Sequence, residues 1–71
     1  SLTAASPLPS AIEWMARCSK RLVGLDPGLG VEQALDLARD MSRDAAMRAR
    51  SPERAAEHRH QLTQQQQFDA G

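Results

Sequence analysis

Residues that could do chemistry are few in this sequence, and the first of them is its single cysteine, Cys18. A catalytic cysteine needs a base held beside it, and both histidines lie far along the chain in a polar segment. A lone cysteine spaced among apolar residues is typical of a small buried side chain. We therefore expect Cys18 in the core. With no catalytic arrangement elsewhere, the sequence predicts a protein that is not an enzyme.

Glu57 and His60 raise the question of a metal site. Their i,i+3 spacing would place both on one helical face, the arrangement that di-metal helical bundles use. Ligands of this kind face inward among apolar residues, whereas the segment around Glu57 and His60 is polar. The pattern favours a solvated helix, so we expect no cofactor. A metal site in a helical bundle stays as an alternative.

Arg17, Lys20 and Arg21 form a basic patch that could contact nucleic acid. Across the chain, nine Lys and Arg residues balance nine Asp and Glu residues, which gives a formal net charge of +0. A nucleic-acid surface needs a basic stripe that acids do not compensate. Nucleic acid is therefore a disfavoured partner. A small nucleic-acid-associated regulator that uses this patch is the alternative function.

Large apolar side chains that fall beside the predicted core are the better functional signal. Trp14 lies at the edge of the apolar stripe of the first expected helix, and Met47 lies off the stripe of the second. Protein interfaces favour such tryptophan and methionine side chains. We predict a protein–protein interaction or assembly module, whose partner is another protein or a second copy of this chain. The candidate interface residues are Trp14, Met15, Arg17, Arg21 and Met47.

The elements that must position these residues are helical, because strand-forming β-branched and aromatic residues are scarce. We predict an all-α fold with helices over residues 10–24, 31–50 and 52–64, between flexible tails at 1–9 and 65–71. Ser10 begins the first helix with a capping box to Glu13. Gly24 ends it in a left-handed cap. Ser51 and Pro52 restart the chain as a third helix.

Apolar residues recur every three or four positions along the first two expected helices. The first stripe contains Ala11, Met15, Cys18, Leu22 and Leu25, widened by Ile12 and Trp14, and the second contains Val31, Ala34, Leu35, Ala38, Met41, Ala45 and Ala49, with Leu37 at its edge. On the outer face of the second helix, acids and arginines are spaced as ion pairs. These pairs are Asp36 with Arg39, Asp40 with Arg43, and Asp44 with Arg48.

A short turn at residues 25–30 makes the first two helices an antiparallel hairpin. A chain of 71 residues has a small core, so folds of this size usually need further support. We therefore expect dimerisation or partner binding to complete a helical bundle. The sequence contains no apolar run that could span a membrane and no signal-peptide pattern. We expect a cytoplasmic protein, and the excess of Arg over Lys suggests a bacterial source.

Overall fold

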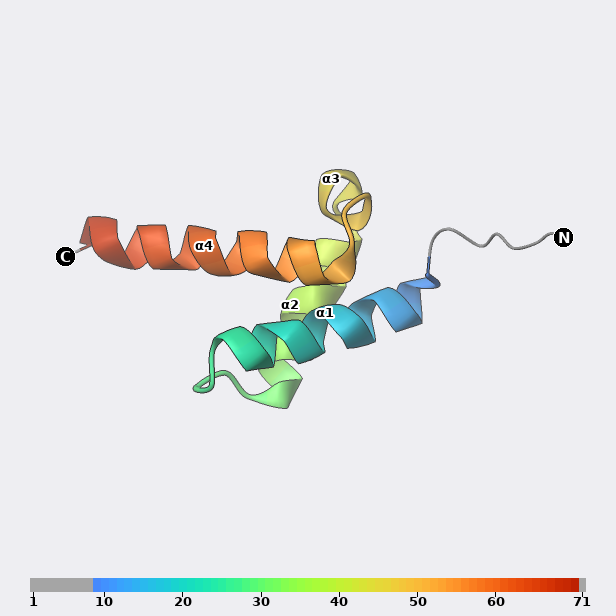
Figure 1. Cartoon of the computed structure of the whole chain (residues 1–71), viewed down its shortest axis with the longest axis horizontal. Coiled ribbons are helices and arrows are strands. Elements are labelled where there is room, and N and C mark those ends of the chain that lie inside the picture. Colours follow the sequence, from blue (N-terminus) through green and yellow to red (C-terminus); the bar gives the residue numbers. More distant parts are fainter. Residues whose placement is uncertain (1–8, 71) are drawn as a thin grey trace, which may run out of the picture.

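The computed structural model describes residues 9–70, with side chains up to residue 65. Its regular structure is helical throughout these residues (Figure 1), which confirms the all-α prediction. Residues 1–8 of the predicted N-terminal tail (1–9) and Gly71 of the predicted C-terminal tail (65–71) lie outside the described residues. The helices are α1 (Ala11–Leu25), α2 (Val31–Ser42), α3 (Ala45–Arg48) and α4 (Pro52–Ala70).

Helix α1 begins where the sequence predicts and ends later. The Ser10 hydroxyl accepts a hydrogen bond from the Glu13 N–H at 3.1 Å. The predicted left-handed cap at Gly24 is wrong, since α1 continues through it and no described glycine has a positive φ. Asp26 ends the helix instead. Its backbone N–H donates to the Leu22 carbonyl, and its side chain accepts from the Gly28 N–H at 3.1 Å, which closes the turn.

The predicted helix over residues 31–50 is two helices, α2 and α3. The Ser42 hydroxyl donates to the Arg39 carbonyl at 2.7 Å, and the Asp44 carboxylate accepts from the Ala46 N–H at 2.9 Å. Both side chains offer the backbone an alternative to the continuous helical ladder. The Arg43 N–H then bonds the carbonyl three residues back, at Asp40. The chain therefore stops as α2 at Ser42 and is capped again by Asp44.

Helix α4 begins as predicted but extends further than residue 64. The Ser51 hydroxyl accepts from the Arg54 N–H at 3.2 Å, and Pro52 occupies the first helical position, where its missing N–H costs nothing. The helix continues through the glutamine run to Ala70. Glutamine is a good helix former, so a polar run of this kind carries the helix on.

Helices α1 and α4 lie side by side and point the same way, whereas α2 crosses behind both (Figure 1). Three contacts between α1 and the α4 region join residues that are 36 apart in sequence. A constant separation requires parallel helices. Helix α2 packs back on α1, where Cys18 contacts Met41 near the end of α2. It crosses α1 obliquely and does not run strictly antiparallel to it, whereas the hairpin prediction expected antiparallel helices (Figure 1). Helix α4, which corresponds to the predicted third helix, thus packs on α1.

The core lies where α1, α2 and α4 meet, and it is made largely of small side chains. Alanines from α2 and α4 let the helix backbones approach closely, and Trp14 fills the largest volume. The buried face of α1 is rotated from the predicted stripe, since Trp14 is inside and Ile12 is 77% exposed. Val31 is also exposed, at 63%. The buried apolar residues are Trp14, Cys18, Leu22, Ala34, Ala38, Met41, Ala55 and Ala56.

Candidate protein-binding groove

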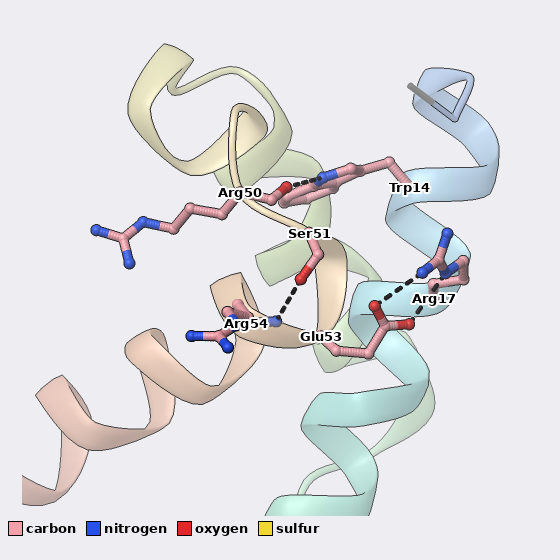
Figure 2. A network of polar contacts seen from close by, with 6 residues as sticks. All are labelled: Trp14, Arg17, Arg50, Ser51, Glu53 and Arg54. Atoms are coloured by element: carbon pink, nitrogen blue, oxygen red, sulfur yellow. Dashed lines mark hydrogen bonds and ion pairs between the residues drawn. The ribbon is translucent and has the colours of Figure 1, made fainter. Parts of the chain in front are cut away.

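Trp14 lies in the core and not at an interface edge. Its side chain is 0% exposed, and its indole Nε1 donates to the Arg50 carbonyl at 3.1 Å (Figure 2). The Arg48 guanidinium lies over the ring, 5.8 Å from its centroid, at the distance of a cation–π contact. This corrects its predicted position at the edge of the stripe. Trp14 ties α1 to the chain just before α4.

Arg17 and Arg21 are engaged within the chain. Both nitrogens of the Arg17 fork donate to the Glu53 carboxylate, at 3.0 and 2.8 Å (Figure 2), and Arg21 donates to Glu57 at 3.1 Å. The hydrogen bond from Arg17 holds the pKa of the Glu53 carboxyl below its usual range, and the same bond raises the pKa of Arg17. These two predicted interface residues therefore connect α1 to α4.

The predicted basic patch is largely compensated. Arg17, Lys20 and Arg21 line an open hollow of about 360 Å³ together with Gly24 and Glu53. Two of its three cations have a carboxylate partner, since Arg17 pairs with Glu53 and Arg21 with Glu57. Such a surface lacks the uncompensated basic stripe of a nucleic-acid site.

Cys18 is a buried apolar side chain, as expected. Its sulfur lies 3.9 Å from the Met41 sulfur, and the residue is fully buried. Burial raises the pKa of the Cys18 thiol to about 11, and the negative charge of Glu53 contributes to this rise. A nucleophilic cysteine needs the thiolate form near neutral pH. Cys18 is protonated there.

The two residues of the alternative metal site have different surroundings in the structure. The Glu57 carboxylate pairs with Arg21 on α1, whereas His60 lines a hollow that also contains Asp26. Among the described residues, no group of three or more His, Cys, Asp or Glu side chains could hold a metal ion. Within the described residues, Glu57 is therefore engaged with Arg21 and not with a cluster of metal ligands.

An apolar groove between α2 and α4 is the feature that best fits a binding site. It consists of two adjoining hollows of about 200 and 90 Å³, which share Leu37 and Arg59. We call this surface the α2–α4 groove. The first hollow is lined by Leu37, Asp40, Met41, Asp44, Met47 and Arg59, and the second by Leu22, Asp26, Leu29, Leu37, Arg59, His60 and Thr63.

The walls of the α2–α4 groove differ in charge. Asp40 and Asp44 line it from the α2 side, and Arg59 lines it from α4. The predicted pairs of these acids are not formed: Arg48 turns to the Pro9 carbonyl at 3.0 Å, and within the described residues Asp40 has no ion-pair partner. Asp36 and Arg39 do pair, at 3.8 Å. Asp40 therefore remains without an ion-pair partner among the described residues, whereas Asp44 caps α3.

Of the predicted interface residues, Met47 alone lines this groove. Met15 is half-buried and packs against the core from α1. Asp40 and Arg59 were not predictable as groove residues, because the local spacing of Asp40 predicts a pair with Arg43. Leu37 was placed only at the edge of the α2 stripe. This edge position was the one indication in the sequence that Leu37 could line a groove, since a side chain at the edge of a stripe can face either the core or a neighbouring molecule.

No family model, curated protein or solved structure matches this chain. Within the described residues, no helix is both long and apolar enough to cross a bilayer.

Proposed function

We propose that this protein is a small, non-enzymatic interaction or assembly module that binds a helix of its partner in the α2–α4 groove. The observation that carries the proposal is the apolar floor of the groove. Leu22, Leu29, Leu37, Met41 and Met47 line it beneath polar rims. A helix laid into an apolar groove is a common mode of protein recognition.

The polar rims support this mode of binding. A fully apolar groove does not fix the register or the orientation of a bound helix. Charged side chains at its edges fix both and increase the association rate. Asp40 and Asp44 on one rim and Arg59 on the other supply such a pattern. Met41 and Met47 supply flexible side chains that adapt to a partner's shape.

Two leucines on α2 provide a matched test. Leu37 lines the groove, whereas Leu35 is 40% exposed and does not line it. We expect Leu37→Lys to abolish association with a second copy or another protein, and Leu35→Lys to leave it intact. Sedimentation velocity over a concentration series measures the first association, and retention of proteins on the immobilised chain measures the second.

Circular dichroism of both variants must show unchanged helix content. Equal behaviour of the two variants would refute the groove as the binding surface. A wild-type chain that stays monomeric and retains nothing beyond what the Leu37→Lys variant retains would refute the proposed function as a whole.

A further inference from the structure

The attachment of α4 to the rest of the fold changes along its length. Its buried side chains are Pro52, Ala55 and Ala56, which all lie at the start of the helix. Among the described residues, no α4 side chain after Ala56 is buried, although the helix continues to Ala70. Figure 1 shows α4 diverging from α1 in this direction. The helix is therefore packed at its start and less firmly held beyond it.

Two exposed ion pairs join α4 to α1. Arg17 pairs with Glu53 at 2.8 Å, and Arg21 pairs with Glu57 at 3.1 Å. All four side chains are between 42% and 46% exposed, so dissolved salt screens both pairs. Each exposed pair of this kind contributes little to stability. The strength of the contact between α1 and α4 therefore depends on ionic strength.

On its α2 side, α4 borders the two hollows of the α2–α4 groove. Arg59 lines both hollows, and His60 and Thr63 line the smaller one of about 90 Å³. A side chain beside a hollow has fewer neighbouring atoms than one in a close-packed interior, and it loses the attraction of those atoms. Within its described side chains, α4 beyond Ala56 therefore lacks close apolar packing on this side as well.

The chain just before α4 is anchored separately. The Arg50 carbonyl accepts the hydrogen bond from Trp14 Nε1 at 3.1 Å (Figure 2), and Arg50 and Ser51 lie between α3 and α4. The Pro52 side chain is fully buried. A rotation of α4 about Ser51 and Pro52 therefore leaves the bond between Trp14 and Arg50 intact.

We infer that α4 is a releasable strap, which pivots at Ser51 and Pro52 and leaves α1 when its ion pairs are screened or removed. Release uncovers Cys18, because this fully buried residue lies in one core cluster with Ala55 and Ala56. Release also opens the α2–α4 groove, since α4 forms one of its walls. Local opening of a single element is a common motion in proteins. The inference stands on the contacts of α4 and does not depend on what the groove binds.

The only cysteine and the only tryptophan of the chain report on the two kinds of opening separately. Iodoacetamide, an uncharged reagent, alkylates Cys18 when the thiol is exposed, and the emission of Trp14 follows global unfolding. In dilute urea, Cys18 should react faster than the globally unfolded fraction allows. Raising the salt concentration from about 0.01 M to about 1 M should increase this rate about twofold to tenfold, with little change in Trp14 emission.

A matched pair of variants assigns the effect to the contact between α1 and α4. Arg21→Gln removes the pair with Glu57, whereas Arg39→Gln removes the pair with Asp36, which lies inside α2. Arg21→Gln should increase the alkylation rate of Cys18 about twofold to fivefold and reduce its response to salt. Arg39→Gln should leave both unchanged. Trp14 emission at each urea concentration corrects for any difference in global stability.

Two results would overturn the inference. One is alkylation of Cys18 that coincides with the change in Trp14 emission at every urea concentration, since the chain would then open only by unfolding as a whole. The other is an equal effect of Arg21→Gln and Arg39→Gln on the alkylation rate. Neither measurement detects binding in the groove, so a failure here is distinct from a failure of the proposed function.

Discussion

At the residue scale, Trp14 determines how the chain is closed. Its position was predictable only as an apolar side chain near the stripe of the first helix. Trp14 is buried among residues of other helices and donates a long-range hydrogen bond to Arg50, and local periodicity encodes neither contact. The same holds for Arg17, whose bidentate partner Glu53 is 36 residues away. Trp14 and Arg17, which were predicted to contact a partner, thus contact other parts of their own chain.

Replacing Trp14 with Phe tests this role. Trp14→Phe keeps most of the apolar volume but removes the Nε1 donor, so the Arg50 carbonyl loses its partner. A hydrogen bond that is only partly buried contributes about 0.5–1.5 kcal/mol net. We expect the free energy of unfolding, measured by urea denaturation followed by circular dichroism, to fall by that amount. An unchanged free energy would mean that the indole hydrogen bond contributes nothing to closure.

The thiol of Cys18 gives a prediction at high pH. Burial raises its pKa to about 11, above the value of about 8.5 expected in the unfolded chain. The protonated thiol therefore stabilises the fold fully below the unfolded value. This contribution is lost as pH rises toward the folded value. Wild type should lose stability relative to Cys18→Ala over that window, measured by denaturation at each pH. A constant difference would contradict the burial of the thiol.

Glu53 gives a prediction at low pH. The Arg17 hydrogen bond holds its pKa below the usual value, which is about 4.3 in the unfolded chain. The ionised carboxylate therefore stabilises the fold above that value, and the contribution is lost as pH falls through the folded pKa. Thermal melts should show wild type more stable than Glu53→Gln at neutral pH and equal to it in acid. A difference that persists in acid would assign the effect to packing.

At the element scale, helix starts were predictable because they depend on neighbouring residues. Ser10 and Ser51 cap α1 and α4 where the sequence indicates. The break between α2 and α3 was missed, because Ser42 and Asp44 are also tolerated inside helices. Only their bonds to the Arg39 carbonyl and the Ala46 N–H show that they interrupt the ladder.

Gly24 provides a test of the corrected end of α1. The residue lies inside the helix with an ordinary φ, and a Cβ added there would meet nothing within 4 Å. Gly24→Ala should therefore stabilise the protein by about 0.5–1 kcal/mol, because alanine loses less backbone entropy on folding. Urea denaturation measures the change. Destabilisation would restore the left-handed cap that the sequence predicts.

At the scale of the whole molecule, the all-α class was predictable from composition, and the arrangement of the helices was not. Parallel packing of α4 on α1 depends on contacts such as Arg21 with Glu57, far apart in sequence. That packing leaves the α2–α4 groove open on one side of the core. The groove is formed by residues that are far apart in the sequence. This explains why Met47 is the one groove residue that was predicted at an interface.

The most direct test of the groove as a protein-binding surface is photo-crosslinking from Leu37. A photoreactive amino acid replaces Leu37 in one preparation and Asp36, which does not line the groove, in a matched control. Mass spectrometry then identifies the crosslinked peptides. We predict that position 37 gives crosslinks to another chain, recognised by a product heavier than one chain, and that position 36 gives no comparable product. Equal yields from the two positions, or no product from either, would contradict the groove as a binding surface.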